Sequence, residues 1–222
     1  MPAVDHLVYA VPDLDIGVQR IADLTGVTAV AGGSHPGAGT RNALLSFDDD
    51  SYFEIISVDP DQPEPATALP FGVDPARPSR LAGFAVHPTG GETIEGMAEQ
   101  MTALGLPVGP ITAMSRRRPD GVELNWRLTH RRSPEILAAT AGVVPFVIDW
   151  GATETPARST PRMGRLARLR LSHPDPDVIA ALRSLDLESP GEIVVTVGDP
   201  GLHASVQLDD GRLVELGRSH AL

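Results

Sequence analysis

A short apolar segment occurs three times in this chain, and each copy is followed by a residue pattern typical of a helix. The three copies align without gaps, at residues 6–13, 82–89 and 168–175. Each is an apolar run that ends in proline and then Asp or Thr, a polar residue suited to cap a helix. This is the pattern of a strand that passes into a helix. The chain is therefore expected to contain three related units.

The first copy opens the most regular pattern, which covers residues 1–59. Apolar residues recur at helical spacing between Asp13, a suitable N-cap, and Gly26, a suitable C-terminal stop. The residues that follow predict three strands, at 27–30, 43–47 and 52–58. The first unit is thus expected to be a strand, a helix and three strands, abbreviated βαβββ.

The same order of elements is expected twice more, in a second unit (residues 80–150) and a third unit (residues 164–222). The linkers before them are rich in proline or in polar residues. The remaining strands and one short helix are predicted at 81–86, 111–115, 121–129, 134–142 (the helix), 146–150, 166–171, 192–197, 202–208 and 213–216. The predicted fold class is α+β with repeated βαβββ units.

Composition narrows the classes of function. The net charge of -11 disfavours a nucleic-acid surface, which needs a dense cationic field. All 18 basic residues are arginine, so catalysis by a lysine Schiff base is excluded. With no cysteine there is no thiolate zinc site, and any metal must be held by His, Asp or Glu. No signal peptide or transmembrane stretch is evident, so we expect a cytoplasmic protein that does not bind membranes.

His6 and Glu54 are the residues of the first unit most suited to chemistry. His6 lies in the first predicted strand and Glu54 in the last, so their side chains can meet if the unit curls into a half-barrel. An imidazole and a carboxylate on an apolar concave face can hold a divalent metal, or they can simply pair as a buried polar cluster. Two ligands do not complete a metal site, and the others would have to come from another unit.

Two segments of the first unit carry a family resemblance: Asp5-His6-Leu7-Val8-Tyr9-Ala10-Val11-Pro12-Asp13-Leu14-Asp15 and Tyr52-Phe53-Glu54-Ile55-Ile56. With the βαβββ order, they resemble the glyoxalase-like branch of the vicinal oxygen chelate superfamily. Proteins of that superfamily pair two such units around a cleft, where first and last strands supply metal ligands. The resemblance implies a curled-sheet cleft with His6 and Glu54 as ligands of a divalent metal of unknown identity. The third unit would either close the cleft or form a homodimer contact.

The other copies depart from this ligand pattern. Ala82 and Arg168 stand where the first unit has His6, while Glu215 falls where the repeat places Glu54. A set of three ligands would therefore be His6, Glu54 and Glu215, with Asp149 of the second unit as the alternative third ligand. An exposed strand position is the competing interpretation of Glu215.

The glycine-rich segment 32–42 is a second candidate for the site. Its four glycines let backbone approach a ligand closely, and His35, Arg41 and Asn42 could orient a carboxylate or carbonyl group. It resembles a His-Pro-Gly-x-Gly-Thr-x-Asn segment of glyoxalase-like proteins, although a flexible connection explains the glycines equally well. Trp150 is expected at the edge of the cleft, as a further substrate-binding residue. The basic run 116–118 could attract an anion, but it is interpreted as a solvated turn.

Together these features favour a metal-dependent lyase, isomerase or dioxygenase that acts on a small substrate with vicinal oxygens. Glu54 is the candidate catalytic residue, and its carboxylate or a metal-bound water would serve as the base. The alternative is a metal-free protein that binds or sequesters a small molecule in the same cleft. The missing ligands at the first-strand positions of the second and third units favour this alternative. A pure dimerisation protein would leave the glycine-rich segment unexplained.

Overall fold

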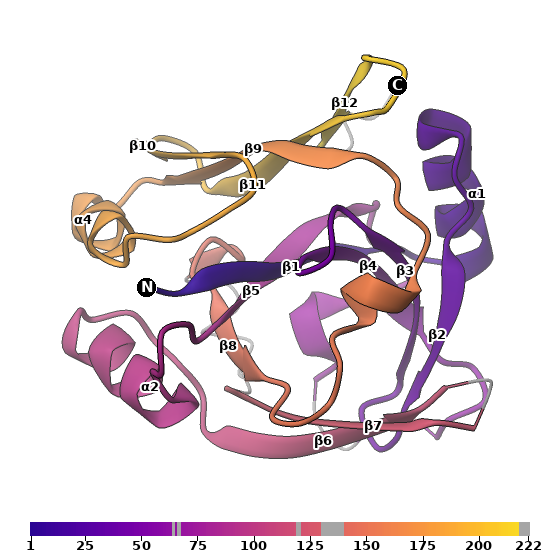
Figure 1. Cartoon of the computed structure of the whole chain (residues 1–222), viewed down its shortest axis with the longest axis horizontal. Coiled ribbons are helices and arrows are strands. Elements are labelled where there is room, and N and C mark those ends of the chain that lie inside the picture. Colours follow the sequence, from indigo (N-terminus) through magenta and orange to yellow (C-terminus); the bar gives the residue numbers. More distant parts are fainter. Residues whose placement is uncertain (64, 66–67, 119–120, 130–139, 218–222) are drawn as a thin grey trace.

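The computed structural model describes residues 1–63, 65, 68–118, 121–129 and 140–217, and most of the helix predicted at 134–142 lies outside them. Strands of the first two units form one sheet of eight, in the order β2-β3-β4-β1-β5-β8-β7-β6. The sheet curls until its edges approach each other, with β1, β4 and β5 on one side and β6 and β7 opposite (Figure 1). The fold is α+β, as predicted.

The described elements of the first two units follow the predicted order, with two short 3-10 helices added. Their bounds are β1 (Ala3–Ala10), α1 (Leu14–Thr25), β2 (Val30–His35), β3 (Thr40–Ser46), β4 (Tyr52–Val58), the 3-10 helix η1 (Pro70–Gly72), β5 (Arg80–His87), α2 (Ile94–Ala103), β6 (Ile111–Arg117), β7 (Glu123–Thr129), β8 (Phe146–Asp149) and the 3-10 helix η2 (Pro156–Ser159). Helix α1 begins and ends as expected, since the Asp13 side chain accepts a hydrogen bond from the Ile16 amide and Gly26 adopts φ 78°.

The segment 32–42 is a β-hairpin and not the loop that its glycines suggested. Strands β2 and β3 pair antiparallel from Val30↔Leu44 to His35↔Thr40. Because side chains alternate across a strand, neighbouring residues of β3 point to opposite faces of the sheet. This alternation decides which polar residues of the hairpin reach the interior of the curled sheet.

The third unit has the predicted order of elements but a different strand pairing. It comprises β9 (Arg165–His173), α4 (Pro176–Ser184), β10 (Glu192–Val197), β11 (Gly201–Gln207) and β12 (Leu213–Leu216). In the first two units the first strand pairs in parallel with the last, β1 with β4 and β5 with β8. In the third unit β9 pairs in parallel with β10, and β12 lies at the sheet edge beyond β11. Its sequence repeat therefore does not carry the geometry of the first unit.

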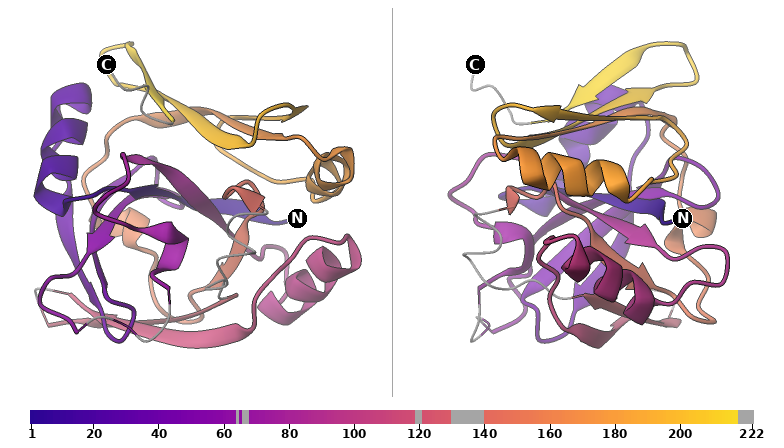
Figure 2. Two further views of the ribbon diagram at one scale, coloured as in Figure 1. Left: turned by 180° about the vertical axis from the view of Figure 1, so that it is seen from behind. Right: turned by 90° about the vertical axis from the view of Figure 1, so that its left-hand side faces the viewer.

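The four strands of the third unit form a second sheet, which covers the outer face of the curled sheet (Figures 1 and 2). Leu7 and Tyr9 of β1 pack in one apolar cluster with Leu169 of β9 and Leu202 of β11. Val8 and Ala10 of β1 belong to a separate cluster inside the curl. The third unit thus buries the outer face of β1, and a homodimer contact through it remains a prediction.

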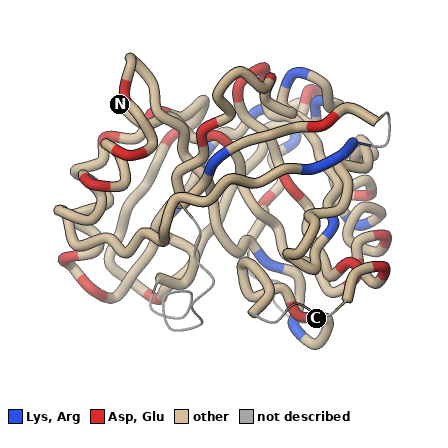
Figure 3. The backbone as a smooth tube through the Cα atoms, turned by 90° about the horizontal axis from the view of Figure 1, so that it is seen from below, with Lys and Arg blue, Asp and Glu red and all other residues tan. Residues whose placement is uncertain are grey.

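Acidic residues are spread along the described backbone and interspersed with the fewer arginines (Figure 3). None of the described helices combines the length and the apolar character needed to cross a bilayer.

A β-bulge in β1 places a buried carboxylate where the two halves of the sheet meet. The β1–β5 register jumps between Val4↔Val86 and His6↔Ala85, so Asp5 is the extra residue. Asp5 is 1% exposed, and its Oδ1 lies 2.6 Å from His6 Nδ1. Its Oδ2 accepts a hydrogen bond of 3.0 Å from Trp150 Nε1 and lies 3.2 Å from His87 Nδ1. Side chains from β1, β5 and the segment after β8 therefore converge on one carboxylate.

Gly142 allows the backbone before β8 to approach β5 closely. It adopts φ 80°, and a Cβ placed there would lie 2.5 Å from the carbonyl oxygen of Ala82. Gly105 has a similar φ of 75° with nothing within 4 Å of such a Cβ. We expect Gly142→Ala to lower the free energy of unfolding by about 1–3 kcal/mol more than Gly105→Ala does, because only the first adds overpacking. Denaturant titration measures both, and equal losses would contradict the close approach.

The Asp5 cluster predicts a pH-dependent contribution to stability. Interaction with Asp5 raises the pKa of His87 above its ordinary value of 6.5, despite opposing burial. A histidine whose pKa is higher in the folded state than in the unfolded state stabilises the protein fully at pH values below the unfolded-state pKa. This stabilisation is lost as the pH rises through the folded-state pKa. Replacing His87 by Asn should therefore cost roughly 1.5–3 kcal/mol at pH 5.5 and distinctly less at pH 8.5.

His35→Asn is the control for this pH effect, because burial lowers the pKa of His35. Its stabilising contribution should fall as pH falls, which is the opposite trend. Denaturant titrations of the three proteins at both pH values measure the effect. If the cost of His87→Asn grew with rising pH, the assigned ion pair would be wrong.

Candidate functional site

The inner face of the curled sheet lines a partly open cavity of ≈ 100 Å³, to which both halves of the sheet contribute. Most of its wall is apolar and aromatic, including Phe71, Trp126, Phe146 and Ile148. Polar side chains gather in one part of the wall: His6, His35, Asn42, Glu54 and Arg116. An apolar cavity with a few convergent polar groups is the usual form of a small-molecule site.

Glu54 and His6 meet in this cavity, as the sequence predicted. Strand β4 pairs with β1 so that Glu54 stands beside Val8, one inward-facing position from His6. His6 Nε2 lies 3.7 Å from Glu54 Oε2, a separation too long for a direct hydrogen bond. Both residues are buried, at 3% and 6% exposure. The other ring nitrogen of His6 faces Asp5, so the carboxylate of Asp5 fixes the orientation of the imidazole.

Asn42 connects Glu54 to a buried arginine. Arg116 Nη1 donates a hydrogen bond of 3.0 Å to Asn42 Oδ1, and Asn42 Nδ2 donates one of 2.6 Å to Glu54 Oε1. Because arginine only donates, the Asn42 oxygen must face Arg116, and its amide nitrogen must face Glu54. The orientation of this side chain therefore follows from its partners. One amide holds a carboxylate on one side and a guanidinium on the other.

The same network sets the protonation of His35. Its Nε2 lies 3.2 Å from Asn42 Nδ2, which is a donor, so this ring nitrogen is the acceptor. The Nδ1–H then donates to Thr40 Oγ1 at 3.0 Å. Burial lowers the pKa of His35, which agrees with a neutral ring. His35 Nε2 also lies 3.8 Å from Glu54 Oε1, so the Glu54 carboxylate has an imidazole on each side.

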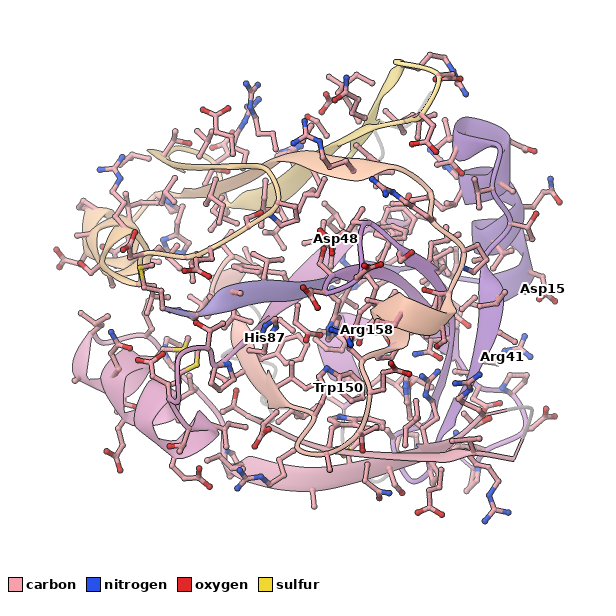
Figure 4. The ribbon with its side chains drawn as sticks, in the orientation of Figure 1. Asp15, Arg41, Asp48, His87, Trp150 and Arg158 are labelled. Atoms are coloured by element: carbon pink, nitrogen blue, oxygen red, sulfur yellow. The ribbon has the colours of Figure 1, made fainter. Side chains whose placement is uncertain are left out.

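Tyr52 and Trp150 close the cavity beside His6. The Tyr52 ring stacks on the His6 ring with centroids 4.5 Å apart, and burial raises the pKa of Tyr52 well above 10.0. Trp150 lines the cavity through its ring while its Nε1 hydrogen bonds to Asp5. Figure 4 shows Trp150 and His87 near the centre of the molecule.

Three of the four predicted substrate-binding residues line the cavity: His35, Asn42 and Trp150. Arg41 does not, and it lies at the edge of the molecule in Figure 4. The reason is the alternation along β3, which directs Asn42 inward and its neighbour Arg41 outward. The sequence interpretation treated the hairpin as a loop, where neighbouring side chains can converge, and so did not separate Arg41 from Asn42; substrate binding by Arg41 stays a prediction.

Neither predicted third metal ligand joins His6 and Glu54. Glu215 lies on β12, at the edge of the second sheet, is exposed, and accepts a hydrogen bond of 2.9 Å from Ser205 Oγ. Asp149 lies outside the cavity and is 2.6 Å from Arg127 Nη2. The described ranges contain no group of three His, Asp or Glu side chains placed to hold a metal ion. The described donor set therefore does not fit the metal that the resemblance implied.

Arg116 is the cavity residue that the sequence interpretation missed. The run 116–118 was assigned to a solvated turn, but β6 extends to Arg117, and Arg116 is 3% exposed. Arg117 points the other way, with its side chain 75% exposed. Extending the alternation of β6 through the arginines would have placed Arg116 on the inner face, so the pattern itself carried the signal.

Comparison with known proteins gives a family and a fold. The family described as the glyoxalase-like domain matches residues 4–185 of the chain. The chain is similar to a hypothetical protein from Staphylococcus aureus, with 15% identity, a TM-score of 0.59, and coverage of 100% of this chain and 88% of that one. This identity is low enough that the likeness shows the fold alone. No curated protein matches the chain.

Methylmalonyl-CoA epimerases are more distant structural neighbours. The enzyme from Mycobacterium tuberculosis has 16% identity and a TM-score of 0.38, with coverage of 66% of this chain and 85% of that one. The enzyme from Streptomyces coelicolor, with an S115T substitution and bound 2-nitronate-propionyl-CoA, has 18% identity and a TM-score of 0.43, with coverage of 70% and 100%. The family match includes β1, the curled sheet and the cavity residues described above. The chain therefore belongs to the glyoxalase-like domain family, as the two segments of its first unit indicated.

Proposed function

We propose that this protein is an enzyme that transfers a proton at the carbon beside a carbonyl group of a small substrate with vicinal oxygens. Glu54 is the general base. The observation that carries the proposal is the setting of Glu54: it is buried, lines the cavity, and is oriented by the 2.6 Å hydrogen bond from Asn42. A buried base held in one geometry is what proton abstraction from carbon requires.

The proposed step balances within the substrate and Glu54. The Glu54 carboxylate takes a proton from the carbon beside the carbonyl, and the electron pair of that C–H bond forms the C=C bond of an enolate. Negative charge moves to the carbonyl oxygen. The proton returns to the same carbon or to a neighbouring atom, which gives exchange or isomerisation. His6, held by Asp5 and 3.7 Å from Glu54, is placed to exchange protons with that base.

Deuterium exchange tests the role of Glu54 directly. Protons at C3 of 2-oxobutyrate should be replaced by deuterium in D2O in the presence of the protein, as followed by proton NMR. Glu54→Gln keeps the size and an acceptor for Asn42 but removes the base, so the exchange rate should fall by about 10²–10⁴-fold. His6→Gln should cause a smaller loss. If Glu54→Gln kept the wild-type exchange rate and only His6→Gln lowered it, the base would be His6 and not Glu54.

A protein that binds without turnover is the second candidate, and the largely apolar wall of the cavity favours it. Calorimetric titration with 2-oxobutyrate, combined with the deuterium-exchange measurement on wild type and Glu54→Gln, separates the two candidates. An enzyme loses exchange in this variant and retains binding. A protein that only sequesters its ligand shows binding and no exchange above buffer, in the wild type as well as in the variant.

The described donor set also predicts how the protein behaves toward metals. Because His6 and Glu54 lack a third ligand among the described residues, exchange activity should survive dialysis against a chelator. Elemental analysis of protein purified without chelator should find no stoichiometric divalent metal. A 1:1 content of one metal that disappears in His6→Ala would restore the metal-dependent mechanism implied by the family resemblance.

A further inference from the structure

Arg116 reaches the cavity at the place where the two edges of the curled sheet approach each other. It comes from β6 and packs against β2. A Cβ on Gly32 would lie 2.2 Å from Arg116 Nη1, and one on Gly33 would lie 3.3 Å from Arg116 Cγ. The glycines of β2 therefore make room for this side chain. The close approach that the glycines of this segment allow is thus used, at Gly32 and Gly33, by the side chain of Arg116.

The guanidinium of Arg116 is buried, and the described residues use only part of its capacity for hydrogen bonds. It has five N–H donors, and the hydrogen bond to Asn42 Oδ1 uses one of them. In the part of the chain that the structure describes, no carboxylate oxygen lies within 4.0 Å of it. Burying a cation is costly unless it is paired and hydrogen bonded. The cavity that Arg116 lines is where the remaining donors can find a partner.

We infer that Arg116 makes the cavity selective for small monocarboxylates. The planar guanidinium fork matches the two oxygens of a carboxylate, or one carboxylate oxygen and the vicinal carbonyl oxygen of a 2-oxo acid. One guanidinium beside the carboxylate of Glu54 suits a single negative charge better than a phosphate dianion. The volume of ≈ 100 Å³ suits a ligand group of a few heavy atoms.

A role of Arg116 in catalysis rests on the proposed function, in which Glu54 is the base. Asn42 lies between Arg116 and Glu54 and hydrogen bonds to both. A 2-oxo acid whose vicinal oxygens bind Arg116 carries its acidic carbon on the other side of the carbonyl. The fixed amide of Asn42 thus sets the distance between the anion anchor and the base. The same guanidinium would also stabilise the negative charge that develops on the enolate oxygen.

Binding of a matched pair of probes tests the anchor without requiring turnover. The acid 2-oxobutyrate and its neutral amide, 2-oxobutanamide, differ only in the group that Arg116 is expected to bind. Calorimetric titration should show the acid binding wild-type protein at least about tenfold more tightly, as for a charge-assisted hydrogen bond. Arg116→Gln should abolish this preference. Arg117→Gln is the matched control, because that neighbouring side chain is 75% exposed, and it should keep the preference.

The wild-type measurement stands even if Arg116→Gln fails to fold. Equal binding of acid and amide to the wild type would overturn the inference, and so would inorganic phosphate that binds more tightly than 2-oxobutyrate. A preference for the acid that disappears in Arg116→Gln supports it, whatever Glu54→Gln does to deuterium exchange. Conversely, exchange that depends on Glu54 with no acid preference would retain the proposed function and remove the anchor.

Discussion

The pairing of β1 with β5 joins the two halves of the curled sheet, and the cavity depends on it. This junction carries the β-bulge at Asp5, which turns a carboxylate toward His6, His87 and Trp150. A buried carboxylate is stable only when such partners surround it. Burial alone would raise the pKa of Asp5, but the contacts with His6 and His87 outweigh this effect and lower the pKa below its ordinary value. The same contacts orient His6 toward Glu54. The junction that joins the two halves of the sheet therefore also orients the imidazole of the site.

Within the cavity, Asn42 determines how the two charged side chains, Arg116 and Glu54, are placed. Its amide accepts from Arg116 and donates to Glu54, so it separates a guanidinium from a carboxylate that would otherwise pair directly. A direct ion pair would neutralise both groups, whereas the separated arrangement leaves each able to meet a ligand. The polar wall thus combines a base with an anion anchor, and aromatic side chains line the rest of the cavity. This combination is the physical basis for the proton transfer and the carboxylate selectivity proposed above.

Prediction from sequence was accurate where local pattern determines structure. The strands at 52–58, 192–197 and 213–216 and the caps of α1 follow from residue alternation and capping chemistry. Prediction was wrong where it relied on long-range equivalence. Glu215 aligns with Glu54 in sequence, but β12 does not pair with β9 as β4 pairs with β1. An ungapped repeat conserves the order of elements, while strand pairing depends on how the elements pack.

The sequence by itself determined the α+β class, the family resemblance, and which side chains share a strand face with His6 and with Glu54, because short-range periodicity fixes the alternation of side chains along a strand. Only the tertiary structure decided which other residues join them. The approach of β6 to β2 buries Arg116 in the cavity, and the alternation of β3 within a hairpin brings in Asn42 and leaves out Arg41. These positions depend on contacts between strands far apart in the chain, and no local pattern encodes such contacts.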